Sequence, residues 1–344
     1  MSSRPGFPSL TAACAEIAAL APRTAAEGPW RSGALAALAR HGVLAMFVPC
    51  DAGGTGDAER DLVAALAAIA ERCLTTALAL SQWAAAVRII AGGPPAVRER
   101  LPPLAAGAEF TTVGISQLTT SRQHGPAPAL TATSEEGVWR LDGVCPWVTG
   151  ADSVATIVTG AATDDGGRRF FVVPAGSPGL EIDSPLALLA LDGSRTAEVR
   201  FQGVRVTETI SAGPDGPRTG GLATTALAVG ATRASIALVA AEAAARPALA
   251  PIAAGLAAEA ADLIARLDAA ATHGVEPVDR DRLRADANGL VVRAAQAALT
   301  AAKGAGFVRG HPAERLARES LFFLVWSCPQ AVSGAVLCEL AGLG

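Results

Sequence analysis

The chain has 344 residues, of which 51% are hydrophobic and 17% are charged, and its formal net charge is −4. This composition excludes an intrinsically disordered chain, which combines low hydrophobicity with high net charge. The 28 basic and 32 acidic residues leave no basic field for a phosphate backbone, so we expect no nucleic-acid partner. At ~150 residues per domain, the length corresponds to about two domains.

Most of the apolar excess is alanine, and charged residues or glycines interrupt the apolar runs. We therefore expect no run of about 20 large apolar residues and no membrane partner. The opening segment, with Arg4 and two prolines, does not match a secretory signal peptide, which favours a cytoplasmic protein. The six cysteines and four histidines are scattered, so neither a disulfide framework nor a metal site is expected.

Residues 9–100 are predicted to be helical, because apolar residues recur there every three or four positions. The loop MFVPCDAGGTGD (46–57) interrupts these helices, since its proline and glycines stop helix formation. A phosphate cradle at Gly53–Gly56 is a less favoured alternative for this loop. The prolines of residues 92–107 indicate a surface stretch.

From residue 110 to 210 the pattern changes to short runs rich in β-branched residues, separated by Gly, Asp and Pro. A spacing of roughly ten residues is typical of an antiparallel sandwich or barrel. The segment ATDDGGRRFFVV (162–173) predicts a hairpin turn that enters a buried strand.

The helical period then returns in four long segments with small side chains, which must pack against each other to be stable. These segments are 222–245, 249–271, 279–304 and 314–327. The sequence thus predicts an α+β protein with an N-terminal helical domain (1–109), a middle antiparallel β domain (110–212) and a C-terminal four-helix bundle (213–344).

One segment of the β domain points to a ligand. WRLDGVCPWVT (139–149) places Trp147 and Thr149 two residues apart, on one face of a strand. An aromatic ring and a hydroxyl on one face suit a planar heteroaromatic ligand, because the ring stacks and the hydroxyl bonds a ring nitrogen. A core tryptophan beside a surface threonine is the plain structural alternative. Near the C-terminus, KGAGF (303–307) indicates a glycine kink between helices, and an ordinary helix C-cap followed by a charged helix start is the structural alternative.

Four segments in this order resemble the acyl-CoA dehydrogenase family, and the resemblance extends over nearly the whole chain. They are VPCDAGGTG (48–56), WRLDGVCPWVT (139–149), VRFQGVRV (199–206) and GAGFVRGHPAERLARE (304–319). The resemblance implies a helical domain, a β domain and a four-helix bundle, with FAD bound between the last two. It implies cofactor-binding roles for Leu118, Thr119, Trp147, Thr149, Gly304, Gly306 and Trp326.

The chain departs from this family at the catalytic base. In the family a glutamate removes the α-proton of an acyl thioester, and the β-hydrogen leaves as a hydride to flavin N5. The register carried forward from Arg318 places that glutamate at Ser327, whose unassisted hydroxyl is far too weak a base. A second family position for the glutamate falls near Gly220-Gly221.

A relocated base therefore has three candidates, which are Cys328, Glu319 and His311. The cofactor segments depart as well, because LTTSR (118–122) lacks the acid and the Gly-Ser-Asp of the family's loop. The segment that reaches the FAD of a neighbouring subunit is missing after Arg246. FAD remains the expected cofactor.

The resemblance implies a flavin-dependent oxidoreductase that acts on an acyl thioester of coenzyme A or a carrier protein, as a homodimer or homotetramer. Two alternatives stay open. One is an oxygen-activating flavoenzyme on the same fold, and the other is a catalytically silent subunit that pairs with an active relative. We favour the oxidoreductase because a silent scaffold has little reason to retain Trp147 and Thr149.

Overall fold

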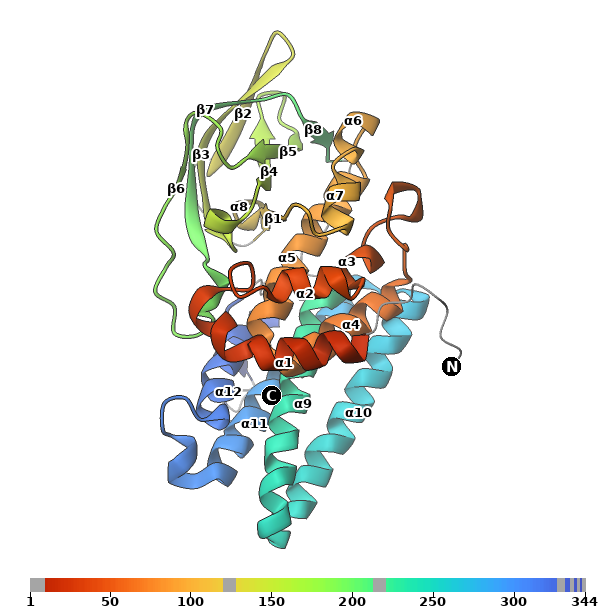
Figure 1. The fold of residues 1–344 in the computed structure, drawn as a ribbon, viewed down its shortest axis with the longest axis vertical. Coiled ribbons are helices and arrows are strands. Elements are labelled where there is room, and N and C mark those ends of the chain that lie inside the picture. The colour runs from red at the N-terminus through yellow and green to blue at the C-terminus, as the bar shows by residue number, and fades with distance from the viewer. Residues whose placement is uncertain are drawn as a thin grey trace. The chain divides into compact units, whose positions relative to one another are not determined.

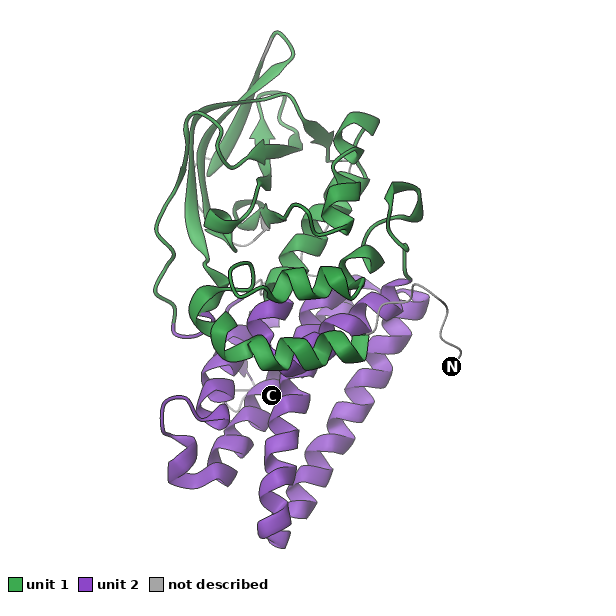
Figure 2. Cartoon of the chain, viewed as in Figure 1, with its two compact units in different colours: residues 1–57, 78–188, 192–219 green, residues 58–77, 189–191, 220–344 purple. Residues whose placement is uncertain are grey.

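The computed structural model describes residues 10–119, 128–212, 221–326, 332–334, 337–338 and 341. In chain order they contain N-terminal helices, a mixed sheet and C-terminal helices (Figure 1), which confirms the predicted fold class. The chain divides into two compact units, each made of segments that are not contiguous in sequence (Figure 2). The first unit contains residues 1–57, 78–188 and 192–219, and the second contains residues 58–77, 189–191 and 220–344. The division into three domains at residues 109 and 212 stays a prediction.

In the described part of the chain before the sheet there are seven α-helices. They are α1 (Leu10–Glu27), α2 (Ala34–Arg40), α3 (Val43–Met46), α4 (Glu59–Arg72), α5 (Leu74–Ala91), α6 (Pro95–Arg98) and α7 (Leu101–Ala105). The helices α6 and α7 lie in the stretch predicted to be surface, and they bury Val97 and Leu101. The other residues of 92–107 are mostly exposed or half-buried, as expected of a surface stretch, and its prolines are compatible with these helices because the first turn of a helix does not need their missing N–H.

The glycine-rich loop after α3 folds onto itself. The N–H groups of Gly54 and Gly56 donate to the carbonyls of Pro49 and Val48, at 3.1 and 2.9 Å. A Cβ on Gly54 would lie 1.9 Å from the carbonyl oxygen of Val48, so only glycine permits this approach. Because these N–H groups are taken up by the loop's own carbonyls, the loop does not present them to a phosphate.

The described residues contain eight strands that form one sheet in the order β6-β7-β3-β2-β4-β5-β8, with β1 paired to β4. Their bounds are β1 (Thr111–Gly114), β2 (Leu130–Glu135), β3 (Val138–Val148), β4 (Thr156–Thr163), β5 (Arg168–Pro174), β6 (Leu180–Ile182), β7 (Ala197–Val206) and β8 (Thr209–Ser211). The sheet is not fully antiparallel as predicted, because β1 and β2 both pair parallel to β4. Residue alternation indicates strands but not their neighbours, which explains this difference.

The predicted hairpin is confirmed. It joins β4 to β5 antiparallel, and its turn contains Gly166 at a φ of 80°. Phe171 and Val173 of β5 are buried in the core of the sheet, together with Leu141, Cys145 and Val148 of β3. The register of β3 against β7 shifts between Cys145 and Val148, which lets two residues three positions apart face the same core.

The second unit is helical and contains α4, α9 (Gly221–Ala245), α10 (Ala250–His273), α11 (Pro277–Gly306) and α12 (Pro312–Ser320). The helix α9 packs against α4, α10 and α11. A Cβ on Gly230 of α9 would lie 2.3 Å from the carbonyl oxygen of Ala67 on α4, so this glycine allows the two helices to approach closely. A helix from the N-terminal part of the chain thus joins the bundle.

The fourth long helix predicted for the bundle, 314–327, is shorter than expected. The helix α12 ends at Ser320 and is followed by a 3₁₀ turn, Leu321–Leu324. Side chains of α11 bind two backbone carbonyls of this segment, since Asn288 donates to Phe323 O and Arg284 donates to Trp326 O, both at 2.8 Å. These carbonyls are thereby satisfied without a continued helix.

Among the residues that the structure describes, three helical segments are long and apolar enough to cross a membrane by length and composition alone, namely Leu74–Ala91, Gly221–Ala245 and Pro247–His273. The expectation that charges and glycines break up every such run was therefore wrong; α5, for example, carries a single charged residue, Arg88. Most of the apolar window is buried within the protein in the first two segments (72% and 67%), but only 17% is buried in the third.

Candidate functional site

Trp147 and Thr149 lie at the end of β3, in the first unit. The Trp147 side chain is 50% exposed, whereas its neighbour Val148 is buried in the core of the sheet. The strand ends at Val148, so Thr149 belongs to the following turn rather than to the strand as predicted. The reason is Gly150, whose φ of 66° turns the chain away from the sheet.

The Thr149 hydroxyl belongs to a buried group of three hydroxyls. Thr149 Oγ1 lies 3.4 Å from Thr196 Oγ1, which in turn lies 2.8 Å from Ser194 Oγ. All three side chains are buried. The sequence analysis did not identify Ser194 or Thr196, although they follow each other at i and i+2 directly before β7.

An ion pair fixes the two turns that carry these hydroxyls. Arg195 donates from Nε to both carboxylate oxygens of Asp152, at 2.9 Å each. Partial burial raises the pKa of Asp152, but hydrogen bonds from Arg195 and Ser153 outweigh burial and hold that pKa below its usual range. The turn after β3 and the turn before β7 are thus tied together by a charged contact.

Leu118 and Thr119 end the short helix α8 (Ser116–Thr119), which packs against β3. Buried Gln117 anchors this helix, because its amide donates to Gly160 O on β4 at 2.8 Å. Within the first unit the structure therefore brings α8 to the strand that carries Trp147, as the resemblance implies.

Trp326 lies in the second unit, beside the buried side chain of Arg284 on α11. Its indole stacks on Phe322 with ring centroids 4.7 Å apart, and the guanidinium of Arg284 lies 6.0 Å from its ring centroid. Together with the hydrogen bond from Arg284 to Trp326 O, these contacts fix the backbone directly before position 327. Ser327 and Cys328 lie outside the described residues.

Gly304 and Gly306 lie at the other end of α11, where Phe307 follows. A Cβ on Gly306 would lie 2.6 Å from Ala302 Cβ, whereas Gly304 is surrounded by open space. Gly304 follows Arg284 by 20 residues along α11, which corresponds to about 30 Å. One flavin ring cannot contact both Gly304 and Trp326 of the same chain, so these predicted cofactor residues do not form one site within the second unit.

Two of the predicted base candidates are described, and both are engaged. His311 Nδ1 accepts a hydrogen bond from Ala313 N at 3.1 Å and so caps α12. Glu319 is 5% exposed and pairs with Arg315 at 3.1 Å. Burial raises the pKa of Glu319, and the nearby Arg315 guanidinium opposes this increase. The second position at which the family carries its glutamate falls near Gly221. This residue is the first of α9, and as a glycine it has no carboxylate.

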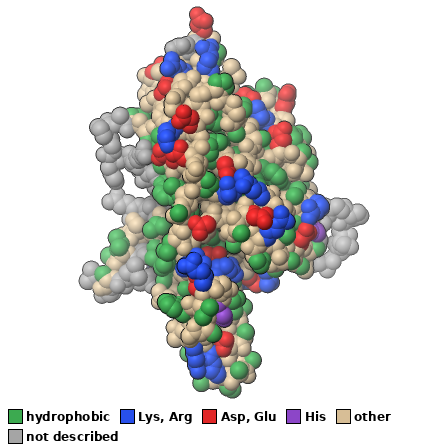
Figure 3. Space-filling view, turned by 60° about the vertical axis from the view of Figure 1, so that its left-hand side comes forward, with side chains coloured by type: hydrophobic (Ala, Val, Ile, Leu, Met, Phe, Trp, Pro, Cys, Tyr) green, Lys and Arg blue, Asp and Glu red, His purple; other side chains and the backbone are tan. Residues whose placement is uncertain are grey.

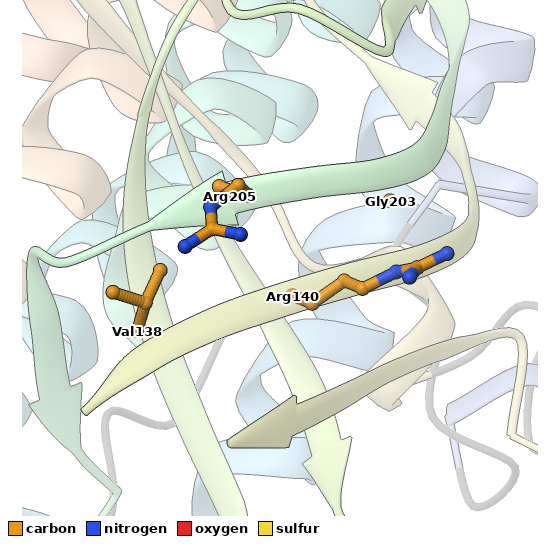
Figure 4. A pocket seen from close by; sticks show the side chains of 4 residues that line it. All are labelled: Val138, Arg140, Gly203 and Arg205. Atoms are coloured by element: carbon orange, nitrogen blue, oxygen red, sulfur yellow. The ribbon is translucent and has the colours of Figure 1, made fainter. Parts of the chain in front are cut away.

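A separate hollow lies on the sheet, between β3 and β7, and is lined by Val138, Arg140, Gly203 and Arg205 (Figure 4). The two guanidinium groups point away from each other (Figure 4), and Arg140 Nε donates to Asp142 at 3.1 Å. The hollow therefore lacks the converging donors of an anion site.

On the molecular face in Figure 3, acidic and basic side chains are interspersed in small groups. Among the described residues, no three His, Cys, Asp or Glu side chains group as metal ligands.

The end of β3 fits a flavin ring. Half of the Trp147 indole is exposed, which leaves an apolar face to cover, and the buried hydroxyls end at Thr149, a donor for a ring nitrogen. These are the residues that would hold the ring, with α8 beside them.

Comparison with known proteins gives three kinds of match. The N-terminal domain model of acyl-CoA dehydrogenases matches residues 11–108. The probable acyl-CoA dehydrogenase YngJ of Bacillus subtilis (strain 168) is 27% identical over 176 residues, which are 48% of this chain and 45% of that protein. The chain thus matches less than half the length of this curated relative.

The solved structures extend the likeness to the whole chain. Butyryl-CoA dehydrogenase from Megasphaera elsdenii is 18% identical with a TM-score of 0.81, covering 99% of both chains. KijD3, solved in complex with FMN and a dTDP-linked amino-keto sugar, is 21% identical with a TM-score of 0.77, covering 100% of this chain and 95% of its own. At these identities the likeness shows the fold. The family model makes residues 11–108 similar to the N-terminal domain of acyl-CoA dehydrogenases, and the structural neighbours show that the whole chain has the fold of these enzymes.

Proposed function

We propose that this protein is a flavin-dependent oxidoreductase that uses FAD to oxidise an acyl thioester of coenzyme A or of a carrier protein. The observation that carries the proposal is the end of β3, where a half-exposed Trp147 precedes the hydroxyl of Thr149 on an acyl-CoA dehydrogenase fold. The chemistry that a bound flavin supplies is the acceptance of two electrons from the substrate.

Residues at the end of β3 and on α8 would hold the flavin ring. Trp147 covers one side of the ring and excludes water from it, because its indole is large and apolar. The Thr149 hydroxyl would donate a hydrogen bond to a nitrogen of a bound flavin ring. Leu118 would contribute to the neighbouring wall from α8.

Proton removal from the substrate is the step for which neither of the two described base candidates is free. Glu319 pairs with Arg315, and His311 caps a helix through Nδ1. Simple α,β-dehydrogenation is therefore expected to be slow, since a positioned general base contributes ~10²–10⁴-fold.

A second candidate is flavin chemistry that needs no such base, including oxygen activation. KijD3 supports this candidate, because a protein of the same fold was solved with FMN and a sugar nucleotide rather than with an acyl thioester.

The absorption spectrum of the purified protein tests the proposal. We expect flavin absorption, FAD in the released cofactor, and anaerobic bleaching by at least one member of a panel of acyl thioesters. A flavin that no acyl thioester bleaches would favour the second candidate. A protein that neither contains flavin nor binds added FAD or FMN would be the silent subunit.

The substitution Ser327→Glu tests the missing base separately. If position 327 faces the substrate as the register predicts, a carboxylate there should raise turnover of simple acyl-CoA substrates by about 10²-fold or more. Ser327→Gln is the matched control, because it adds similar bulk without a basic group. Brisk wild-type turnover would show instead that another base exists.

A further inference from the structure

We propose that Thr196 and Ser194 are positioning residues that direct the hydroxyl hydrogen of Thr149 outward, toward the flavin ring. This role rests on the proposed flavin function and adds two residues of the β7 turn to the β3 site. Neither residue is proposed to touch the ring, since each acts through the hydroxyl next to it.

The three hydroxyls contact each other in a row, and the hydroxyl at one end of the row is buried without a further partner among the described residues. Ser194 is fully buried, and among the described residues Thr196 is the hydrogen-bond partner of its hydroxyl, at 2.8 Å. Thr196 also contacts Thr149 at 3.4 Å, and Thr149 is the member nearest to the half-exposed Trp147 along the chain. Ser194 is therefore the inner end of the chain and Thr149 the outer end.

The burial of Ser194 decides the direction of the hydrogens. Each hydroxyl has one hydrogen to donate and accepts through its lone pairs. If Ser194 donates to Thr196 and Thr196 donates to Thr149, both inner hydrogens are satisfied and the Thr149 hydrogen is left for a ligand. The reverse order would leave the Ser194 hydrogen buried without an acceptor among the described residues, which is costly. Donation along the chain also polarises the last hydroxyl and makes it a better donor.

The turn that carries Ser194 and Thr196 is held rigidly in this arrangement. Arg195, between them, has a φ of 49°, a left-handed conformation that a non-glycine residue adopts at a cost. Its guanidinium is bound to Asp152, and Gly150 N donates to Ser194 O at 2.9 Å. A Cβ on Gly193 would lie 2.2 Å from Thr24 O, so the turn is also packed against α1. A strained, doubly anchored turn is what a fixed hydroxyl direction requires.

The test uses flavin affinity and reduction potential rather than turnover. Thr196→Val removes the middle hydroxyl and keeps the shape, so we expect the Kd for FAD to rise about five-fold, the loss typical of one neutral hydrogen bond. The flavin reduction potential should shift in the same direction as in Thr149→Val. In a Thr149→Val background, Thr196→Val should have no further effect, because it acts through Thr149.

Two matched variants keep the test interpretable. Thr156→Val removes a buried hydroxyl of the same sheet that donates to Thr111 Oγ1 at 3.0 Å, and it should leave the Kd and the potential unchanged. Thr196→Ser retains the hydroxyl and should retain wild-type affinity, which also covers the case that Thr196→Val does not fold. Thermal unfolding of each apo-protein checks the fold.

The outcomes separate this inference from the proposed function. If the wild type binds FAD or FMN and Thr196→Val binds equally well at an unchanged potential, the positioning role is wrong and the proposed function stands. If Thr196→Val weakens binding equally with and without Thr149, the effect is structural and the role is again wrong. If the wild type binds neither flavin, the proposed function fails and this role fails with it.

Discussion

Glu319 is a buried carboxyl whose ionisation is coupled to folding. Its side chain on α12 is 7% exposed, and burial raises its pKa above the ordinary value of 4.5 despite the nearby Arg315. Between 4.5 and the raised value, the folded protein holds a proton on Glu319 that the unfolded chain has released. The free energy of unfolding therefore falls as the pH rises through this window.

We expect Glu319→Gln to remove this loss of stability, because glutamine has the same size but does not ionise. The measurement is urea unfolding at a series of pH values from acidic to neutral. The variant should show a smaller decrease in unfolding free energy toward neutral pH than the wild type.

Glu314, on the same helix, provides a control of opposite sign. The hydrogen bond from Arg318 lowers its pKa, so its contribution to stability is present above 4.5 and is lost as the pH falls through the lowered value. Glu314→Gln should therefore lose stability at neutral pH relative to acidic pH. Equal pH profiles for the two variants would contradict the burial argument.

The sequence predicted two residues of the candidate flavin site but not the two hydroxyl residues behind them. Trp147 and Thr149 are two residues apart, so one strand was enough to associate them. Thr196 lies 47 residues from Thr149, and their contact exists only because β7 pairs with β3. No spacing rule connects hydroxyls across that distance, so Ser194 and Thr196 became visible only in the folded chain.

A kink near the end of α11 is the main backbone irregularity of the second unit. Lys303, the single lysine of the chain, has a φ of 55° and a ψ of −148° within the helix span. This region of conformational space is essentially restricted to glycine and costs other residues ~1–3 kcal/mol. The side chain is exposed, and so the strain comes from the Cβ rather than from crowding.

We expect Lys303→Gly to stabilise the protein by ~1 kcal/mol, since relief of the strain exceeds the entropy that glycine loses on folding. Equilibrium urea unfolding measures the difference. Lys303→Ala is the control, because it removes the charge and keeps the Cβ, and it should bring little gain. A glycine variant no more stable than the alanine variant would show that the kink is not strained.

The sequence predicted whether a segment is a helix or a strand where its periodic pattern was long. It did not predict the residue at which an element ends or the elements that it pairs or packs with. The ten-residue strand β7, Ala197–Val206, lies in the region 110–210 that was predicted to form strands, and it contains the segment VRFQGVRV (199–206). The helix α12 was predicted to extend to residue 327, but it ends at Ser320 because Asn288 and Arg284 bind the next carbonyls. Such tertiary hydrogen bonds leave no trace in local sequence.

At the scale of the whole molecule, α10 presents an outward face made of small apolar residues. Its inward residues recur at heptad spacing and are buried, namely Ala253, Leu256, Ala260, Leu263, Leu267 and Ala270. Its charged residues pair within the chain, since Glu259 binds Arg293, Asp268 binds Arg60 and Arg266 binds Asp286. The exposed alanines that remain lie on the opposite side, at positions 254, 258, 261, 265 and 269.

This outward face bears on the proposed homodimer or homotetramer. Small side chains let helices of two copies approach closely, and their burial would remove an apolar surface from water. We therefore expect Ala258→Glu to weaken self-association, because it places a charge at the centre of the face while remaining compatible with a helix. Ala106→Glu, at an exposed position of the first unit after α7, is the control and should associate like the wild type.

Sedimentation velocity at micromolar concentration, without lipid or detergent, decides the point. The wild type and Ala106→Glu should sediment as a dimer or tetramer, and Ala258→Glu should shift toward the monomer at an unchanged circular dichroism spectrum. A wild-type monomer that instead partitions into lipid vesicles would contradict the oligomer, since the segment Pro247–His273 is also apolar enough for a membrane. An oligomer that Ala258→Glu leaves intact would mean that the copies meet through another surface.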